Sequence, residues 1–431
     1  MRGPEIPASL ALYRAATSLA QPFAGALIAH RARLGKEDLS RAGEREGFAG
    51  RPRPPGRLVW LHGASVGETV SLLPIVARLC ENSLNVLVTS VTMTSAGILA
   101  RRLPPGALHQ YAPFDTPLFM RRFLDHWRPD LALFAESELW PNAIIESRRR
   151  DIPLGLLNAR MSERSLARWR RLPRTIAALT GCFDLCLAQS EVDAERYRFL
   201  GAHAVSTAGN LKYDVPPPPA DQVELASLRG MTAGRPTLLA ASTHAGEEAI
   251  LAQAHGGLAA RFPGLLTIIV PRHPQRGGEA VAAVRAAGLR PALRSQGQGP
   301  DGACDVYVAD TMGELGLFYR LTPIVFMGKS LVPHGGQNPI EPAKLGAAIL
   351  HGPHVENFAG VYAVLDEAGG ARQISDGRAL AEAIAELIVN PKGLRDMARA
   401  AGLAVDKLTG AVDRTMRAIE PYLAHLSREA R

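Results

Sequence analysis

The chain has few of the residues that build disulfide or metal frameworks. It contains four cysteines in 431 residues, and Cys182 and Cys186 do not have the two-residue spacing of a zinc knuckle. No second pair lies nearby, so we expect free thiols in a reducing compartment. The sequence also has no His-x-x-x-His or Asp-x-Asp array of the kind that holds a divalent ion. We therefore expect chemistry that uses neither a metal nor a cofactor.

Aromatic residues are also sparse, at 6% of the chain, and they do not alternate with basic residues in a pattern that stacks nucleic-acid bases. Nucleic acid is therefore not the favoured partner. The net charge of +8 and the isoelectric point near 9.6 instead favour a phosphate, a carboxylate or acidic lipid. Hydrophobic residues at 47% and charged residues at 21% are typical of a globular protein. The length predicts two domains.

A long uninterrupted apolar run is missing as well. The most apolar stretch, residues 15–29, contains four polar or proline residues and is shorter than the roughly 20 residues that cross a bilayer. A basic segment follows it, with His30, Arg31, Arg33, Lys36, Arg41 and Arg45. An apolar helix beside arginines is typical of an interfacial anchor on an anionic membrane surface. The alternative is a helix that only packs on its own domain.

Strands and helices alternate through the rest of the chain. Residues 51–56 form a proline-rich linker, and buried strands are predicted at 58–62, 85–89, 131–134, 154–157 and 185–188. An arginine-rich helix is predicted at 165–179. Four prolines at 216–219 mark a domain boundary. The alternation then restarts, with strands predicted at 237–242, 265–270, 306–308, 324–327 and 348–350.

This pattern predicts an α/β protein with two Rossmann-like, doubly wound parallel-sheet domains facing each other across a cleft. We expect five segments. They are the N-terminal membrane-associated helix with its basic flank (1–50), the first domain (51–215), the proline linker (216–222), the second domain (223–392), and C-terminal helices that cross back to the first domain (393–431).

Charged residues follow several predicted strands of the first domain. Glu68 stands after the glycine turn that ends the first strand, where it either caps the next helix or serves as a general base. Glu136 and Glu138 follow a later strand, where strand alternation would place them on one face unless a turn intervenes. Arg160 could meet an acidic substrate or lie on the surface. Lys212 has the compact charge that suits a phosphate or carboxylate.

The second domain has similar residues after its strands. Ser242, Thr243 and Arg272 would form a phosphate cradle, and residues 312–314 make a strand-to-helix turn that could read a base or its phosphate. A strand, a glycine-rich turn and a helix starting near Pro339 then predict a phosphate at a helix N-terminus, with Glu341 accepting hydrogen bonds from a ribose. His334 and His354 flank that turn.

Together these motifs resemble the 3-deoxy-D-manno-octulosonate (Kdo) transferases of lipopolysaccharide assembly over nearly the whole chain. The resemblance rests on Leu61-His-Gly-Ala-Ser-Val-Gly-Glu68, Glu136-Ser-Glu-Leu-Trp-Pro-Asn142, Asn158-Ala-Arg-Met-Ser162, Gly209-Asn-Leu-Lys-Tyr-Asp214, Pro271-Arg-His273 and Gly335-Gly-Gln-Asn-Pro-Ile-Glu341. It implies a GT-B fold with CMP-Kdo as donor, Glu68 as proton acceptor, and Glu138 and Lys212 as transition-state stabilisers. It also implies CMP contacts with Pro271, Arg272, Met312, Gly313, Glu314, Asn338, Pro339, Ile340 and Glu341.

The expected activity is therefore an inverting, metal-independent transfer of Kdo to a lipid A precursor, lipid IVA, on the cytoplasmic side of the inner membrane. Two alternative hypotheses are that the chain is another GT-B nucleotide-sugar enzyme, such as a 2-epimerase, or a membrane-binding protein without catalysis. The arginine-flanked N-terminus disfavours the epimerase, and the set of Glu68, Glu138, Lys212 and Glu341 disfavours the non-catalytic protein. Because every motif lies after residue 56, we expect turnover to survive deletion of residues 1–35.

Overall fold

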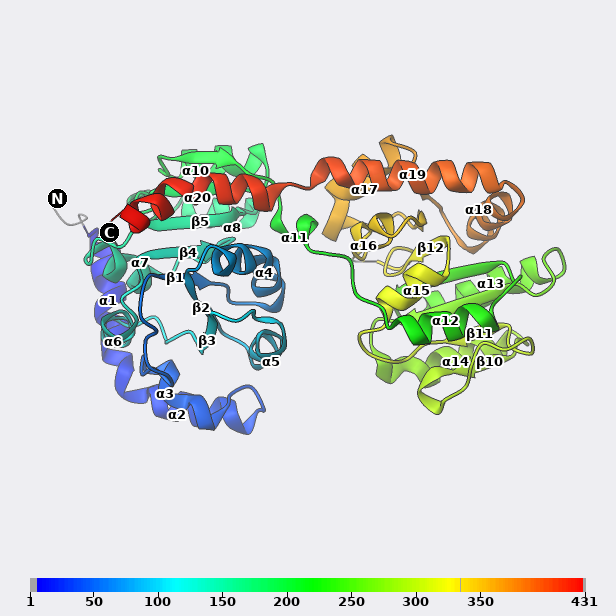
Figure 1. Ribbon diagram of the computed structural model, residues 1–431, viewed down its shortest axis with the longest axis horizontal. Coiled ribbons are helices and arrows are strands. Elements are labelled where there is room, and N and C mark those ends of the chain that lie inside the picture. The colour runs from blue at the N-terminus through cyan, green and yellow to red at the C-terminus, as the bar shows by residue number, and fades with distance from the viewer. Residues whose placement is uncertain (1–5, 334, 429–431) are drawn as a thin grey trace. The chain divides into compact units, whose positions relative to one another are not determined.

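The structure is a computed structural model that describes residues 6–333 and 335–428 (Figure 1). It contains two compact units. Unit 1 comprises the chain up to Val215 together with the segment from Thr409 onward, and unit 2 comprises Pro216–Leu408. Each unit is built on one seven-stranded sheet whose paired strands are all parallel. The prediction of two parallel-sheet α/β domains is confirmed.

The strands of unit 1 are short and almost wholly buried, as expected for a parallel sheet covered on both faces. Their spatial order is β3 (Ala107–Tyr111), β2 (Asn85–Ser90), β1 (Leu58–His62), β4 (Leu131–Ala135), β5 (Leu154–Ala159), β6 (Leu185–Ala188) and β7 (Val205–Thr207).

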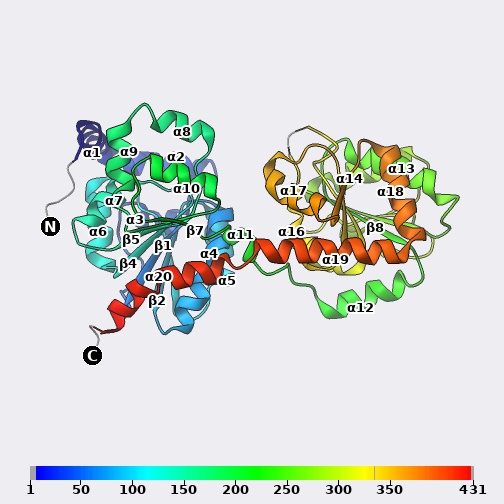
Figure 2. The ribbon, with the colours of Figure 1, turned by 90° about the horizontal axis from the view of Figure 1, so that it is seen from above.

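The helices of unit 1 cover both faces of this sheet (Figures 1 and 2). Trp60 and Phe123 lie in the core on one face, and Leu61, Ile75 and Ile419 lie in the core on the other. The helices are α4 (Val66–Glu81), α5 (Met93–Arg102), α6 (Pro117–Trp127), α7 (Pro141–Arg148), α8 (Glu163–Trp169), α9 (Pro173–Thr180), α10 (Glu191–Phe199), α11 (Leu211–Asp214) and α20 (Ala411–Arg428).

One helix prediction in this unit is wrong. The arginine-rich helix predicted at 165–179 is two helices, α8 and α9, because Pro173 lacks an N–H group and begins a new helix instead of continuing the old one. The edge strand β3 and helix α5 were not predicted. Five helices in the unit begin with a Ser or Thr side chain that accepts the backbone N–H three residues later, which explains where they start.

The N-terminal segment forms helices on the outside of unit 1. These are α1 (Ala8–Ala20), a 3₁₀ turn (Gln21–Phe23) that includes Pro22, α2 (Ala24–Arg33), a second 3₁₀ turn (Leu39–Arg41) and α3 (Ala42–Arg45). Within the described residues, no helix is long and apolar enough to cross a bilayer.

The basic segment of this region is only partly available to a partner. Arg45 is buried and donates to Glu37 at 2.8 Å, and Arg31 pairs with the same carboxylate at 2.9 Å. Arg41 pairs with Glu44 at 2.8 Å. The expectation that the whole segment meets lipid is therefore wrong for Arg45, whose charge is neutralised inside the domain.

Unit 2 repeats the same architecture. Its strand order is β10 (Pro291–Leu293), β11 (Val306–Val308), β9 (Leu266–Pro271), β8 (Thr237–Thr243), β12 (Ile324–Met327), β13 (Ala348–His351) and β14 (Ala371–Gln373). Its helices are α12 (Gln222–Met231), α13 (Glu247–Ala259), α14 (Gly277–Ala286), α15 (Leu315–Leu321), α16 (Ile340–Lys344), α17 (Ala359–Glu367), α18 (Gly377–Val389) and α19 (Pro391–Leu408).

The C-terminal segment is divided between the units. Helix α19 contacts α16, α17 and β13 of unit 2, whereas α20 lies beside α4 and α11 of unit 1 (Figure 2). The Asp214 carboxylate accepts the N–H groups of Gly410 at 2.8 Å and Val412 at 2.6 Å, which fixes the start of α20. The last residue of the Gly209–Asp214 motif therefore ties the returning chain to unit 1.

Candidate functional site

The first βα turn of unit 1 holds the Glu68 carboxylate. Its two oxygens accept the N–H of Ala64 at 2.7 Å and the hydroxyl of Ser65 at 2.6 Å, while Ser65 Oγ accepts the Glu68 N–H at 3.3 Å. The arrangement resembles a capping box, except that Glu68 accepts the N–H of the residue before the N-cap Ser65. A Cβ atom at Gly63 would lie 3.2 Å from that of Glu68, a tight contact that glycine avoids. The carboxylate is half-buried and keeps acceptor capacity toward solvent.

Lys212 lies beside this turn. A Cβ atom added at Gly67 would be 3.8 Å from Lys212 Cε, which shows how closely the lysine passes over the first turn of α4. Its Nζ forms an ion pair with Glu136. Glu136 follows β4 and has φ +52°, a conformation that non-glycine residues rarely adopt and that is common at functional sites. Sequence reasoning placed Glu136 at this edge but did not identify it as the partner of Lys212.

Glu138 has different partners from Glu136. Strand β4 ends at Ala135 and a turn follows it, so the alternative of an intervening turn holds and the two glutamates do not share a strand face. One Glu138 oxygen accepts the Trp140 indole N–H at 2.7 Å and lies 3.7 Å from Nε2 of His62. Burial acts to raise the pKa of Glu138, but His62 and Trp140 outweigh it and hold that pKa below its usual range.

His62 was missed as a site residue. Its side chain is buried, and Nδ1 lies 2.8 Å from the Thr89 hydroxyl, which also accepts the Trp60 indole N–H at 2.8 Å. These contacts direct the other ring nitrogen toward Glu138. Only its position as the last residue of a buried strand could have indicated it. Arg160 follows the neighbouring strand β5 and is exposed, and its backbone N–H donates to the Glu136 carbonyl at 3.4 Å.

In unit 2, the expected cradle of hydroxyls is only partly present. Thr243 is fully buried and its hydroxyl donates to Glu248 at 2.9 Å, so it does not reach a ligand, and that prediction is wrong. Ser242 has φ +57° and is also buried. Arg272 is exposed at the end of β9, and its backbone N–H donates to the Thr243 carbonyl at 3.0 Å. The guanidinium remains a candidate phosphate donor.

Glu247 organises the glycine-rich loop and was not predicted. It is fully buried at the start of α13, and its carboxylate accepts four backbone N–H groups. The donors are His244 at 2.9 Å, Lys329 at 2.7 Å, Ser330 at 3.0 Å and Leu331 at 3.1 Å. One buried charge thus joins the loop after β8 to the loop after β12. His334 lies outside the described residues.

Glu341 and Asn338 follow that loop. The helix predicted near Pro339 is α16, which begins at Ile340 and has only five residues. The phosphate at its N-terminus stays a prediction. Asn338 donates to Glu341 Oε1 at 3.3 Å and accepts the Ile340 N–H at 3.1 Å across Pro339. Burial raises the pKa of the Glu341 carboxyl, although Asn338, Arg272 and Lys344 act in the opposite direction.

The turn after β11 is held by an arginine. Glu314 accepts two hydrogen bonds from Arg294, both at 2.6 Å, and this pair lowers the pKa of Glu314. Arg294 therefore binds both oxygens of the Glu314 carboxylate. A contact between Glu314 and a ligand would be made by its backbone. Met312 is 77% exposed, and Gly313 has φ +84°, which glycine tolerates. In the part of the chain that the structure describes, no group of three or more His, Cys, Asp or Glu residues could hold a metal ion.

Comparisons with known proteins identify the family. The family described as 3-deoxy-D-manno-octulosonic-acid transferase (kdotransferase) matches residues 40–215. The probable mitochondrial 3-deoxy-D-manno-octulosonic acid transferase of Arabidopsis thaliana is 35% identical over 414 residues, 93% of each chain. The 3-deoxy-D-manno-octulosonic acid transferase of Haemophilus influenzae is 33% identical, covering 89% of this chain and 91% of its own.

Solved structures agree on the fold. A glycosyltransferase from Rickettsia africae has a TM-score of 0.57 at 12% identity, covering 86% of this chain and 98% of its own. A UDP-GlcNAc 2-epimerase from Neisseria meningitidis has a TM-score of 0.55 at 14% identity, covering 84% and 100%. These likenesses show the GT-B fold and do not favour epimerase activity. By its full-length relatives, the chain belongs to the 3-deoxy-D-manno-octulosonic acid (Kdo) transferase family, whose members are glycosyltransferases.

Proposed function

We propose that this chain transfers Kdo from CMP-Kdo to a sugar hydroxyl of a phosphorylated lipid A precursor such as lipid IVA, with inversion and without a metal. Family membership supports the Kdo transfer. The observation that carries the chemistry is the grouping of Glu68, the Lys212–Glu136 pair and the Glu138–His62 pair at the carboxyl edge of one sheet. Ligands of open α/β sheets bind at such edges.

Glu68 is the proposed proton acceptor. The bonds from Ala64 and Ser65 fix its carboxylate in one orientation and leave it lone pairs for an incoming hydroxyl. As that hydroxyl loses its proton to Glu68, its oxygen bonds to the anomeric carbon and the bond to CMP breaks. Attack and departure on opposite faces invert the configuration.

Two charges would stabilise the transition state. The anomeric carbon of a sugar gains positive character as the leaving group departs. The lowered pKa of Glu138 keeps its carboxylate ionised, which suits that positive charge. The Lys212 ammonium suits the sugar carboxylate or the departing phosphate. Because CMP carries a single phosphate, a lysine, an arginine and backbone N–H groups can balance its charge without a metal.

Unit 2 would hold the nucleotide. Arg272 would contact the phosphate and Glu341 the ribose hydroxyls, and residues 312–314 would contact CMP through the backbone. Arg272 and Glu341 already interact electrostatically, which supports one common ligand.

The test of the whole proposal is incubation with CMP-Kdo and a tetraacylated lipid A precursor, followed by mass spectrometry of the lipid. A mass gain of one or more Kdo residues is expected, and unmodified lipid at full donor concentration would overturn the proposal.

The N-terminal helices would lie on the anionic cytoplasmic surface of the inner membrane. Their outer side exposes Leu12 (71%), Leu19 (77%) and Phe23 (70%), apolar side chains that a water-facing helix rarely presents together. Arg33 and Lys36 are exposed at the end of this segment. The neighbouring α8–α9 segment, joined to α1 by a Ser9–Thr175 hydroxyl contact of 2.5 Å, exposes further arginines, namely Arg164, Arg168, Arg170, Arg171 and Arg174.

Apolar and cationic residues on adjoining surfaces fit a bilayer of anionic lipid, at about 1 kcal/mol per basic residue. Co-sedimentation with vesicles tests this attachment. Binding should require anionic lipid and weaken in high salt, because the cationic contribution is screened. Equal binding to neutral vesicles at every salt concentration would show that the arginines do not take part.

A further inference from the structure

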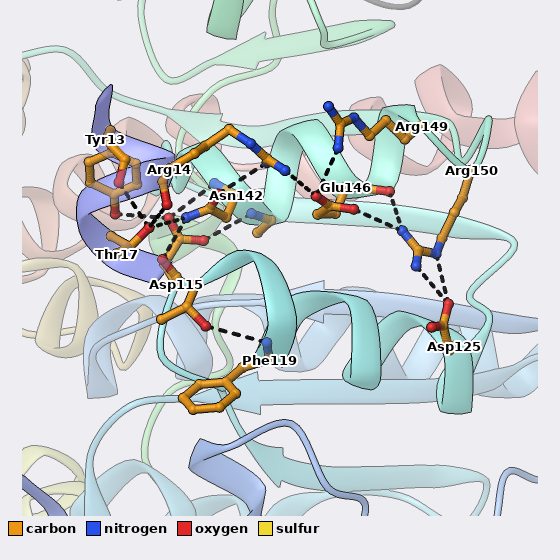
Figure 3. A network of polar contacts seen from close by, with 12 residues as sticks. Tyr13, Arg14, Thr17, Asp115, Phe119, Asp125, Asn142, Glu146, Arg149 and Arg150 are labelled. Carbon is orange, nitrogen blue, oxygen red and sulfur yellow. Dashed lines mark hydrogen bonds and ion pairs between the residues drawn. The ribbon is translucent and has the colours of Figure 1, made fainter. Parts of the chain in front are cut away.

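The side of α1 that faces unit 1 carries several polar side chains beside the buried Leu10, whereas its outer side is mostly apolar. Tyr13 donates its hydroxyl to Asp115 at 3.0 Å, and Arg14 donates to the side chain of Asn142 at 3.1 Å (Figure 3). Arg14 also pairs with the buried carboxylate of Glu146 at 2.5 Å. Thr17 accepts the Asn142 amide at 3.2 Å. Three polar residues of α1 therefore contact either α7 or the Asp115 carboxylate beside its first turn.

Asp115 connects α1 to that turn. Its carboxylate accepts the backbone N–H groups of Asn142 at 3.1 Å and Ala143 at 2.9 Å, and thus caps the start of α7. The Tyr13 hydroxyl bonds to the same carboxylate. Burial raises the pKa of Asp115, while the two amides, Tyr13 and nearby His62 act to lower it. The Tyr13 hydroxyl supplies the third hydrogen bond that this buried acceptor needs.

The first turn of α7 determines where Glu138 lies. Only three residues separate Glu138 from Asn142, and Pro141, one of them, stiffens the chain. Trp140, one residue before α7, donates its indole N–H to Glu138. A shift of the start of α7 therefore moves Trp140 and changes the position of Glu138 relative to His62.

We propose that α1 positions the catalytic carboxylate Glu138, through Tyr13 and Asp115, in addition to attaching the protein to the membrane. Tyr13 and Asp115 are positioning residues in this scheme, and their effect rests on the function proposed above for Glu138. If α1 positions Glu138, deleting residues 1–35 should lower turnover even on an acceptor dispersed in detergent. This outcome is the opposite of the one expected from the sequence, which was that turnover would survive the deletion.

Loss of the Tyr13 hydroxyl should not unfold unit 1. Asp115 keeps both of its backbone donors in a Tyr13→Phe variant, and the tyrosine ring is replaced by one of the same shape. Arg14 continues to hold α1 to Asn142 and Glu146. The variant therefore removes one hydrogen bond to a charged acceptor and leaves the helix in place.

The experiment compares Tyr13→Phe with a Leu12→Ser/Leu19→Ser double variant of the outer side. On detergent-dispersed acceptor, Tyr13→Phe should lower kcat about tenfold, the size expected for one hydrogen bond to a charged group. Its KM for CMP-Kdo and its vesicle binding should be unchanged. Amide hydrogen exchange at residues 142 and 143 should become faster. The double variant should show the reverse pattern, with weakened vesicle binding and wild-type kcat in detergent.

Wild-type kcat in Tyr13→Phe would overturn the inference and show that α1 acts only as an anchor. The inference would also be overturned if cooling restored both the folded fraction and kcat of Tyr13→Phe to the wild-type values. In that case the lowered kcat would reflect a loss of global stability. Absence of transfer in the wild-type protein would instead overturn the proposed function. In that case the hydrogen-exchange comparison still tests whether Tyr13 fixes the start of α7.

Discussion

Replacing Glu247 by glutamine should loosen the glycine-rich loop of unit 2 while leaving its sheet intact. In the wild-type structure each carboxylate oxygen accepts two backbone N–H groups, and all four donors come from residues 244, 329, 330 and 331. A glutamine amide keeps one oxygen but turns an NH₂ group toward two N–H donors. Two hydrogen bonds to a charged group are lost, at about 1.5–3 kcal/mol each, or about 3–6 kcal/mol together.

Native-state hydrogen exchange is the suitable assay, because the loss is local and a two-domain chain does not unfold in one step. Protection of the amides at residues 329–331 should fall by about 10²- to 10⁴-fold, which is the rate equivalent of that energy. Glu279→Gln is the matched control, since Glu279 is exposed and only pairs with Arg276 at the surface. It should change protection very little. Unchanged protection in Glu247→Gln would refute the assignment of this carboxylate as the organiser of the loop.

Three further predictions concern the proposed chemistry. Glu68→Gln should retain CMP binding and lower kcat by about 10²- to 10⁴-fold, the usual range for loss of a general base, and single-turnover assays with wild-type rates would exclude Glu68 from that role. CMP affinity, measured by calorimetry, should fall in Arg272→Ala and in Glu341→Ala. The CMP affinity of the wild-type protein should also fall as the pH is lowered through the pKa of Glu341, which burial raises above the ordinary value of about 4.3. Glu341→Gln should remove this pH dependence. Transfer should persist in excess EDTA, and loss that Mg²⁺ restores would show that a metal takes part.

The strands were the most predictable part of the fold. Buried parallel strands are continuous apolar runs, and the predictions at 58–62 and 185–188 have the same bounds as β1 and β6. The edge strand β3 was missed because its sequence, A-L-H-Q-Y, mixes polar and apolar residues and half of it is only partly buried. Helix ends were harder, since Pro173 divides one apolar pattern into two helices and α16 stops after five residues.

The candidate site was predictable in location but not in its contacts. Glu68, Glu138 and Lys212 all stand at the carboxyl edge that strand–helix alternation assigns to them. Their partners depend on which loops the fold brings together. The sequence does not show that Lys212 pairs with Glu136 instead of Glu138, because the choice depends on how the turn after β4 meets the Lys212 segment. Glu247 was missed for the same reason, since its four donors lie in two loops far apart in the chain.

The N-terminal helix shows most clearly what the sequence leaves open. Tyr13 and Arg14 stand just before the apolar stretch and Thr17 lies within it, and a helix in water would turn such residues toward solvent. In the structure they contact Asp115, Asn142 and Glu146 of unit 1. Leu10 is buried, whereas Leu12 and Leu19 are exposed on the outer side. An exposed apolar side of this kind fits a partner other than water, such as the lipid surface proposed above. The same helix thereby links the surface that would contact lipid to the turn that holds Glu138, so attachment and catalysis are expected to depend on one element.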